Sequence, residues 1–571
     1  MSGVRAHAIA PEGKAVAGGT PGVLGVRRED KNKWERRAPL APHHVRNLVG
    51  QGIKVVVQPS ARRVFSDEEY REAGAVISED LSECATIAAV KEVPVEMLLP
   101  GRTYIFFSHT IKAQPAGMPL LDAALERKVR LIDYECITST GVRGGPRLVA
   151  FGAFAGYAGA IDFLRGLGER FLALGFSTPL LNIGSAFMYR SLDEAKRAVQ
   201  LAGEAIAQHG LPPALCPFTA VFTGKGNVTQ GALSIFQCLP HVMVEPTELQ
   251  RLPQAGHGTR DDCHKLFLSI TTAEHMVKHR HGGHFDKEEY YEKPDQYESI
   301  FQDTILPFST VIVNGMYWDA RFPRLFIHED LHRHVVSGHD RLLGVCDITC
   351  DADGSVPTRQ FTSIEQPFFI FNALTEQTHV SLDEPGVLFH AVDHLPSELP
   401  REASEHFGNC LLEFIPAMVA ARAPTAPGQG DTHQLPPPIR GAVIAEGGDL
   451  TRDYMYIQQL RRAAQAEAEA LPEPTGGAHG VYAPTVSLTL ELSGHLFDTR
   501  LINRICDLVE VSRGRVEINK IDIGGTVSDQ SFMSMVVSAH DKETLDVIVT
   551  QIRSAASEAK VTLRRGGGSG G

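Results

Sequence analysis

The sequence of 571 residues is poor in features that define several other classes of protein. Aromatic residues make up only 7% of it. The net charge is −13 and there is no long run of Lys and Arg, so the sequence does not predict a basic surface that would bind a nucleic-acid backbone. The most membrane-like stretch, residues 148–160, is shorter than the roughly 18 to 20 apolar residues that a spanning helix needs. We therefore expect neither a nucleic acid nor a membrane as a partner.

Cysteine is also sparse and unpatterned. The nine cysteines show no CxxC spacing, which is typical of reduced thiols in an intracellular protein. Residues 1–22 are rich in Gly, Ala and Pro and lack the charged start and apolar stretch of a signal peptide, so we expect a disordered N-terminus and a cytoplasmic location, with the mitochondrial matrix as the alternative. The histidines between His257 and His284 have no repeated ligand spacing, and we expect no metal site.

The length predicts about three domains. Short apolar runs alternate with polar helical segments in residues 23–190 and again in 191–384, a rhythm typical of βαβ units on parallel sheets. We expect an α/β protein with two Rossmann-like domains and a cleft between them. The first would be a substrate domain completed by residues 385–470, and the second would bind a dinucleotide.

A smaller module follows. Residues 471–480 have the composition of a linker, and 481–564 read as strand, helix, strand, strand, helix and a last short strand. This order predicts an α+β module of the ferredoxin-like or ACT-like kind. Residues 565–571 are expected to form a flexible tail.

A glycine-rich segment, 221–232, leaves an apolar run and enters a predicted helix. Gly224 and Gly226 would aim backbone N–H groups and a helix N-terminus at a pyrophosphate. The usual motif has a third glycine where Thr229 stands, and Gly231 comes two residues late. We interpret the segment as an imperfect dinucleotide-binding turn.

Glu245 lies about twenty residues beyond this turn, where the second strand of such a domain ends. There its carboxylate would accept hydrogen bonds from the adenosine ribose. By charge alone this favours NAD over NADP. The alternative is a surface acid that happens to follow a strand.

Three apolar runs of the first domain end in polar side chains: Lys91, His109 and Glu135. The carboxyl ends of parallel strands are where open α/β sheets bind ligands, and a lysine desolvated there could titrate near neutrality. Taken singly, each residue is more often a surface or structural group, but together they predict a site for proton transfer. Arg27 and Arg147 would suit carboxylate substrates.

The same segments carry a family resemblance. The motifs VRREDKNKWERRAPLAP, VKEVP, FFSHTIKAQ, LIDYE, VAFGAFAGYAG, VFTGKGNVTQGA, VNGMYW and GVCDITCD resemble the lysine-ketoglutarate reductase half of bifunctional α-aminoadipic semialdehyde synthases, within the alanine dehydrogenase and transhydrogenase superfamily. Residues 481–558 resemble the interdomain region of the plant-type enzymes, while the saccharopine dehydrogenase half is absent here. The resemblance implies an oxidoreductase that condenses lysine with 2-oxoglutarate and reduces the imine to saccharopine.

The resemblance also implies roles for individual residues. Lys91 matches a general base and His109 a general acid, while the residues matching substrate contacts or groups that tune the pair are Arg27, Lys112, Gln114, Glu135 and Arg147. The residues matching or adjoining nucleotide contacts are Gly224, Gly226, Asn227, Val228, Glu245, Asn314 and Asp347. Relatives usually carry an arginine where Pro146 stands, which puts one cofactor contact in doubt.

The resemblance favours NADPH over NADH as the cofactor, although Glu245 would repel a 2′-phosphate unless it is turned away. It leaves open a homo-oligomer and a saccharopine dehydrogenase domain in the full-length protein. Two other functions remain as alternatives. One is an NAD-dependent, lysine-forming saccharopine dehydrogenase or another alanine dehydrogenase-like enzyme, and the other is a non-catalytic, nucleotide-sensing regulatory protein.

Overall fold

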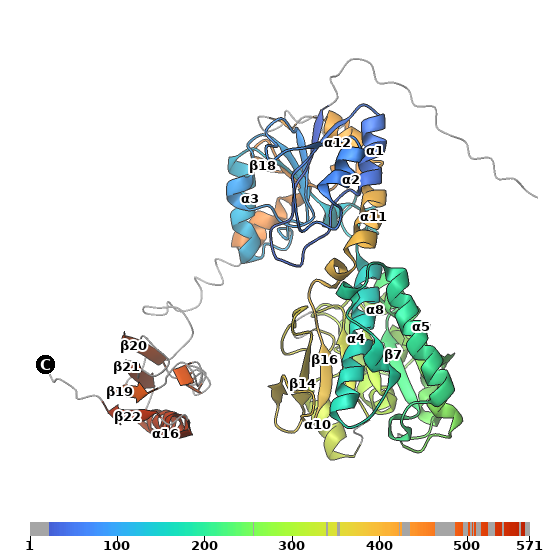
Figure 1. The fold of residues 1–571 in the computed structure, drawn as a ribbon, viewed down its shortest axis with the longest axis vertical. Coiled ribbons are helices and arrows are strands. Elements are labelled where there is room, and N and C mark those ends of the chain that lie inside the picture. The colour runs from blue at the N-terminus through green and yellow to red at the C-terminus, as the bar shows by residue number, and fades with distance from the viewer. Residues whose placement is uncertain are drawn as a thin grey trace, which may run out of the picture. The chain divides into compact units, whose positions relative to one another are not determined.

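The structure of the protein is a computed structural model (Figure 1). It describes residues 22–254, 256–338, 341–350, 354–421, 423–424, 434–462, 486–494, 501–502, 505, 508–509, 515–522, 531–539, 542–558 and 561–565. These residues form two units that divide between Leu460 and Arg461. Residues 1–21, the predicted linker 471–480 and all but the first residue of the predicted tail 565–571 lie outside the described residues.

The first lobe of the larger unit is built on an eight-stranded sheet in the order β18-β17-β6-β5-β4-β1-β2-β3. Strands β1 to β6 run parallel, and β17 and β18 add an antiparallel edge that comes from much later in the chain. The strands are β1 (Val23–Val26), β2 (Lys54–Val57), β3 (Val76–Ile77), β4 (Thr86–Ala88), β5 (Thr103–Phe106), β6 (Arg130–Asp133), β17 (Val443–Glu446) and β18 (Asp449–Leu450).

The second lobe is built on another eight-stranded sheet, in the order β15-β14-β16-β13-β12-β7-β9-β8. The six neighbouring strands β16, β13, β12, β7, β9 and β8 run parallel. β14 is antiparallel to both of its neighbours, β16 and β15. The strands are β7 (Phe218–Thr223), β8 (His241–Met243), β9 (Leu266–Thr271), β12 (Val311–Asn314), β13 (Gly344–Asp347), β14 (Phe368–Asn372), β15 (Gln377–His379) and β16 (Val387–His390). A separate antiparallel pair joins β10 (Val277–His279) and β11 (Tyr297–Ser299).

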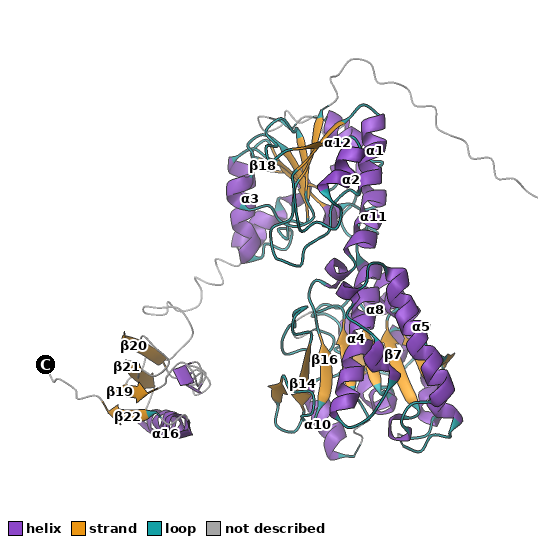
Figure 2. Cartoon of the chain, viewed as in Figure 1, coloured by secondary structure: helices purple, strands orange, loops and turns teal. Residues whose placement is uncertain are grey.

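Helices lie on both faces of the two large sheets (Figure 2). This explains why the central strands are continuous apolar runs, since a parallel sheet is buried on both sides. All six residues of β7 and all four of β5, β6, β12, β13 and β16 are buried. The α-helices of this unit are α1 (Pro42–Gly50), α2 (Asp67–Glu72), α3 (Met118–Glu126), α4 (Gly152–Ala173), α5 (Leu192–His209), α6 (Asn227–Phe236), α7 (Ala273–Met276), α8 (Lys287–Glu292), α9 (Phe301–Thr304), α10 (His328–Val336), α11 (Pro400–Leu411), α12 (Ile415–Ala420) and α13 (Pro437–Arg440).

The chain passes between the lobes twice. It leaves the first lobe just before α4, whose buried residues belong to the core of the second lobe, and it returns through α11. Within α11, Ala403 packs in the second core while Phe407 and Leu411 pack in the first. Among the helices of the described residues, none combines the length and apolar character needed to cross a bilayer.

The smaller unit holds a four-stranded antiparallel sheet in the order β20-β21-β19-β22. Its elements are β19 (Val486–Gly494), β20 (Arg515–Asp522), β21 (Ser531–Ala539), α16 (Lys542–Glu558) and β22 (Thr562–Arg565). Alternate residues of β21 are buried, and they pack with α16 in one small core. The α/β class, with two mostly parallel sheets and a small C-terminal antiparallel sheet, is therefore as the sequence predicted.

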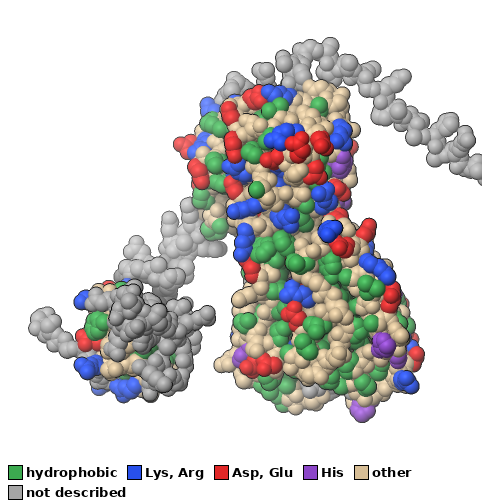
Figure 3. Space-filling model, viewed as in Figure 1, with side chains coloured by type: hydrophobic (Ala, Val, Ile, Leu, Met, Phe, Trp, Pro, Cys, Tyr) green, Lys and Arg blue, Asp and Glu red, His purple; other side chains and the backbone are tan. Residues whose placement is uncertain are grey.

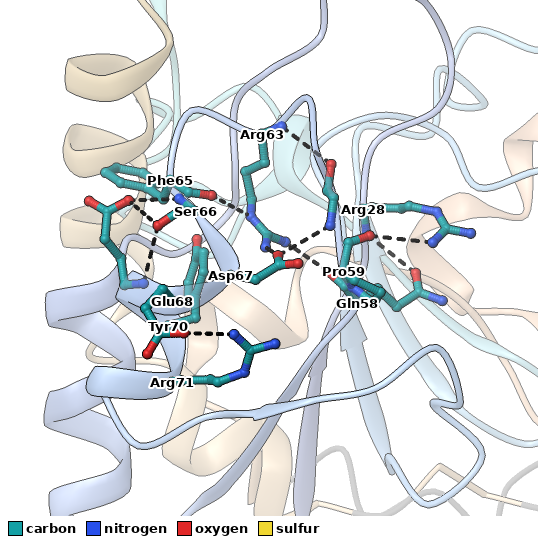
Figure 4. Close-up of polar contacts among 12 residues, drawn as sticks. Arg28, Gln58, Pro59, Arg63, Phe65, Ser66, Asp67, Glu68, Tyr70 and Arg71 are labelled. Carbon is teal, nitrogen blue, oxygen red and sulfur yellow. Dashed lines mark hydrogen bonds and ion pairs between the residues drawn. The ribbon is translucent and has the colours of Figure 1, made fainter.

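A buried arginine organises the loop between β2 and α2 (Figure 4). The Arg63 guanidinium donates to the Gln58 carbonyl at 2.9 Å, the Phe65 carbonyl at 3.1 Å and the Asp67 carboxylate at 2.6 Å. It also lies 4.5 Å from the centre of the Tyr70 ring. Phe65 and Tyr70 are buried and Gln58 and Asp67 are half-buried, so Arg63 is a shared donor in a partly dry loop, although Asp67 also accepts the N–H of Ser60 at 3.2 Å.

We predict that Arg63→Ala lowers the free energy of unfolding of the larger unit by about 2 to 4 kcal/mol, because it leaves buried acceptors unpaired. Urea denaturation followed by circular dichroism measures the loss. Arg71→Ala is the matched control, since Arg71 pairs with Glu68 at 2.8 Å on the exposed side of the same segment and should cost less than about 0.5 kcal/mol. Equal losses in the two variants would contradict the structural role of Arg63.

Candidate functional site

Four side chains at the carboxyl edge of the first sheet come from adjacent parallel strands. Arg27 follows β1, Lys91 follows β4, His109 follows β5 and Glu135 follows β6. Because β1, β4, β5 and β6 are hydrogen-bonded neighbours in one parallel sheet, these segments meet at one edge.

A cavity of about 420 Å³ opens at this edge, where the two lobes meet. It is lined by six of the seven predicted catalytic and substrate residues: Lys91, His109, Lys112, Gln114, Glu135 and Arg147. Arg37, Phe151 and Gly152 complete the side of the first lobe and the start of α4. The surface between the lobes also gathers basic side chains (Figure 3).

Arg27 is the one predicted substrate-binding residue that does not line this cavity. Its guanidinium is 6% exposed, donates to both carboxylate oxygens of Asp30 at 2.5 and 3.2 Å and donates to the Arg28 carbonyl at 2.7 Å. In this arrangement Arg27 holds the segment after β1 in place and faces Asp30.

Sequence reasoning missed the part of the cavity that belongs to the second lobe. Asp393 and His394 line it from the segment after β16. Burial lowers the pKa of His394, and no described residue offers its Nε2 a hydrogen-bond partner. The signal was present, because this polar pair directly follows the apolar strand VLFHAV, as the polar residues of the first lobe follow theirs.

Lys91 occupies a partly buried position. Burial lowers the pKa of its ammonium, and the neighbouring positive charge of Arg37 lowers it further. The carboxylates of Glu35 and Glu92 act in the opposite direction. The net effect lowers the pKa of Lys91, so its amine loses a proton more readily than that of a solvated lysine.

The Glu35–Arg37 pair explains how a second cation is tolerated beside Lys91. The two side chains are 1% and 4% exposed and contact each other at 2.6 Å. Burial alone would raise the pKa of Glu35, but the charge and hydrogen bonds of Arg37 hold it below the ordinary value. The Arg37 guanidinium also lies 4.3 Å from the centre of the Phe151 ring, which keeps it at the cavity wall.

The backbone of Lys91 is fixed by Glu29. The carboxyl group of Glu29 accepts the N–H of Val90 at 2.6 Å and the N–H of Lys91 at 2.9 Å. Burial, together with the nearby charge of Glu35, raises the pKa of Glu29 to about 7. The loop after β1 is thereby tied to the loop after β4.

His109 is held by a carboxylate. Its Nδ1 lies 2.6 Å from Glu92, which also accepts from the Lys31 ammonium at 2.7 Å. Burial would raise the pKa of Glu92, but these hydrogen bonds lower it to about 2. Because Glu92 engages Nδ1, Nε2 is the ring nitrogen left to exchange a proton with a ligand.

Glu135 and Arg147 form an ion pair at the cavity wall. The backbone of Glu135 donates to Asp133 at 2.7 Å, and the same buried carboxyl group accepts the N–H of Ser108 at 2.9 Å. Burial raises the pKa of Asp133 to about 6. Asp133 thus links the segment that carries Glu135 to the residue before His109.

The glycine turn between β7 and α6 fits a dinucleotide. Gly224 has φ of 77°, which a side chain would disfavour, and a Cβ on Gly226 would meet nothing within 4 Å. Asn227 and Val228 begin α6 directly after Gly226, so the first N–H groups of the helix face the turn. The late Gly231 has a packing role, since a Cβ there would lie 2.3 Å from the Ala153 carbonyl of α4.

Two other predicted nucleotide residues face each other. Asn314, at the end of β12, donates to Asp347 at 2.9 Å and accepts from Thr223 at 2.6 Å. Both Asn314 and Asp347 are at most 1% exposed. They brace the carboxyl ends of β7, β12 and β13 beneath the glycine turn.

Glu245 lies one strand further from the glycine turn than the sequence predicted. It is exposed and follows β8, which is the edge strand, and β9 separates β8 from β7. The strand next to β7 is β9, which ends at Thr271, and the Thr271 carbonyl accepts the N–H of Gly224 at 2.8 Å. Neutral Thr271 and Thr272 therefore stand where the sequence predicted an acid.

Comparisons with known proteins give two matches to protein families. Residues 25–158 match the alanine dehydrogenase/PNT N-terminal domain, and residues 487–564 match the conserved region of LOR/SDH bifunctional enzymes. The chain is 41% identical to the α-aminoadipic semialdehyde synthase of Arabidopsis thaliana, over 94% of this chain and 50% of that protein. It is 41% identical to the mitochondrial α-aminoadipic semialdehyde synthase of Bos taurus, over 77% of this chain and 48% of that one.

A more distant relative is the NAD(+), L-lysine-forming saccharopine dehydrogenase of Candida glabrata, which is 26% identical over 69% of this chain and 91% of its own length. The chain spans about half the length of the curated synthases that it matches.

We predict that stability falls between about pH 4.5 and pH 7 through Glu29. Its folded-state pKa of about 7 lies above the ordinary 4.5, so in this window the unfolded chain ionises first and gains stability relative to the fold. The loss would be at most about 3 kcal/mol, complete once pH exceeds 7. Urea denaturation across this range, compared with Glu29→Gln, measures it. The variant should lack this slope, and an unchanged slope would refute the assignment.

Proposed function

We propose, because this chain belongs to the α-aminoadipic semialdehyde synthase family, that it condenses L-lysine with 2-oxoglutarate and reduces the resulting imine to saccharopine. The observation that carries the proposal is the cavity in which Lys91, His109, Glu135 and Arg147 meet. It combines a lysine of lowered pKa, a histidine held by a carboxylate and cationic groups suited to a dicarboxylate substrate.

Lys91 is the proposed general base. The ε-amine of the substrate must be neutral to attack a keto carbon, so a group has to remove its proton. Lys91 can accept this proton because burial and Arg37 destabilise its own charged form. Glu29 holds the backbone of Lys91 at the cavity, which fixes where the amine stands.

His109 is the proposed general acid. Loss of water from the carbinolamine requires a proton at the departing hydroxyl, and Nε2 of His109 can deliver it while Glu92 holds Nδ1. When bound, the reduced nicotinamide supplies a hydride to the imine carbon. Asp393 and His394 line the cavity from the second lobe. Binding of the substrates between the lobes would limit the water that hydrolyses the imine.

Arg147, Lys112 and Gln114 are the proposed substrate contacts. Arg147 is half exposed at the cavity wall, and its pairing with Glu135 orients the guanidinium without burying it. A carboxylate of the substrate can then bind the remaining N–H donors. Arg27 would act indirectly, through the segment that it holds with Asp30.

We propose NADPH as the cofactor, held by the glycine turn at Gly224 and Gly226 and by the N-terminus of α6. Glu245 no longer weighs against the 2′-phosphate, because β9 lies between β8 and the turn. Thr271, which ends β9, and Thr272, which follows it, are neutral, and the Thr272 hydroxyl donates to the Glu274 carboxylate at 2.9 Å. Lys225, within the turn, supplies a nearby positive charge.

The smaller unit is proposed to be a ferredoxin-like, ACT-like regulatory module. In support, its sheet order of β20-β21-β19-β22 with α16 between β21 and β22 fits a βαββαβ plan. The full-length protein would join this part to a saccharopine dehydrogenase part, as in the synthases that are about twice as long. A homo-oligomer is a further proposal.

The more distant similarity to lysine-forming saccharopine dehydrogenases favours one second candidate, the same chemistry run in reverse with NAD. Oxidation of NAD(P)H with lysine plus 2-oxoglutarate, compared with pyruvate plus ammonia, separates the proposed enzyme from an alanine dehydrogenase. Tight cofactor binding with no turnover on either pair would instead indicate a nucleotide-sensing protein.

We predict that Lys91→Met and His109→Ala each lower kcat by roughly 10² to 10⁴-fold while the affinity for the cofactor stays within a factor of about two. Steady-state assays and fluorescence titration with NADPH measure the two quantities. Lys54→Met is the control, because Lys54 pairs with Glu83 on the surface of β2 and should leave both quantities unchanged. Normal turnover in either active-site variant would exclude the proposed acid–base pair.

We predict that Thr272→Asp shifts the ratio of kcat/KM for NADPH over NADH towards NADH by about tenfold or more, because it places an anion beside the ribose. Glu245→Gln, on the edge strand, should change the ratio by less than about threefold, since screening weakens a more distant charge. A larger change in this ratio for Glu245→Gln than for Thr272→Asp would instead indicate that Glu245 lies beside the ribose.

A further inference from the structure

The buried arginines of the described residues differ in one respect. Five of the six have an acidic side chain as a neighbour: Arg27 with Asp30, Arg37 with Glu35, Arg63 with Asp67, Arg130 with Glu446 and Arg170 with Asp383. Arg341 is the exception. Its guanidinium is 8% exposed, and burial lowers its pKa to about 10 with no opposing acid among the residues that the structure describes.

Backbone carbonyls satisfy only part of Arg341. It donates to the Pro217 carbonyl at 2.7 Å and the Pro253 carbonyl at 3.1 Å, while its Nε–H finds no acceptor among the described residues. A guanidinium has five N–H donors and a full charge. A buried cation without an anion is costly, and an incoming anion would relieve that cost.

Arg341 lines a cavity of about 560 Å³ on the second lobe. The cavity lies at the amino-terminal edge of the sheet, because Thr310 and Leu343, which also line it, directly precede β12 and β13. The glycine turn follows the carboxyl end of β7, at the opposite edge of the same parallel sheet. This cavity is therefore separate from the proposed nucleotide and substrate sites.

The lining selects for one kind of ligand. Around Arg341 the walls are mixed: Leu174, Phe176 and Phe308 contribute apolar surface, while Gln254, Thr310 and Ser337 contribute neutral polar groups. None of the described residues that line the cavity is an aspartate or glutamate. A free amino acid would bring an ammonium group that no acidic side chain among the described lining residues could neutralise, whereas a carboxylate on an apolar body would match the cation and the apolar part of the walls.

We propose that this cavity binds a small amphipathic monocarboxylate whose carboxylate pairs with Arg341 and whose apolar part packs against Leu174, Phe176 and Phe308. The carboxylate would accept from Nε–H and the unused N–H groups of the guanidinium, which is the fork geometry that arginine offers. The volume lies within the range of small-molecule sites in proteins.

Calorimetric titration of the whole chain with octanoate, and separately with octanamide, tests the proposal. We expect octanoate to bind, and octanamide to bind at least about tenfold more weakly, because the amide lacks the negative charge that would pair with Arg341. Arg341→Gln should remove this preference, and Arg197→Gln, an exposed arginine of α5, should preserve it. Equal binding of the acid and the amide, or no binding of octanoate at millimolar concentration, would overturn the proposal.

A second variant guards against a folding defect in Arg341→Gln. Ala214 lines the cavity from its exposed rim, so Ala214→Phe should fill the space while leaving Arg341 and its carbonyl partners intact. We expect this variant to lose octanoate binding by about tenfold or more, since the apolar part then has no room. Wild-type binding in a correctly folded Ala214→Phe would likewise contradict the proposed site. Because binding is measured without turnover, the result is independent of the proposed enzymatic function.

Discussion

The parallel alignment of β1, β4, β5 and β6 is the constraint from which the rest of the site follows. Parallel strands place all their carboxyl ends at one edge, so residues that are far apart in the chain meet there without any long-range loop. Buried carboxyl groups then fix the loops against one another. Glu29 joins the loops after β1 and β4, and Asp133 joins those after β5 and β6. These contacts turn a row of strand ends into a rigid cavity wall.

Much of this wall could be predicted from sequence, for a physical reason. A strand buried on both faces reads as a continuous apolar run, so the polar residue that ends it is conspicuous, as Lys91, His109 and Glu135 are. The same signal at Asp393 and His394 went unused because that strand belongs to the other lobe. Nothing in the local sequence shows that the two edges face each other. Arg27 satisfied the pattern as well, yet its neighbour Asp30 engages it, and pairing of that kind depends on side-chain geometry.

Strand order was beyond sequence reasoning. The run that carries Glu245 comes second in its domain, and chain order suggested that it lies next to β7. The sheet instead places β9 between them, which suits their burial, since five of the six residues of β9 are buried and β8 has none buried. The glycine motif shows a related lesson. Gly231 looked misplaced for a pyrophosphate, but its position is set by the close approach of α4 to α6.

The chain crosses between the lobes twice, and this bears on the order in which the steps of the proposed reaction could take place. Lys91, His109, Glu135 and Arg147 all precede α4, so the groups proposed to handle protons belong to one lobe, while the glycine turn belongs to the other. If the lobes rotate about the two connections at α4 and α11, the proton-handling set stays assembled throughout. Such a rotation would alter the distance between the reacting carbon and the nucleotide, together with access for water. The carbon–nitrogen bond formation and the reduction of the proposed reaction would then be separable in time, the first depending on one lobe and the second on both.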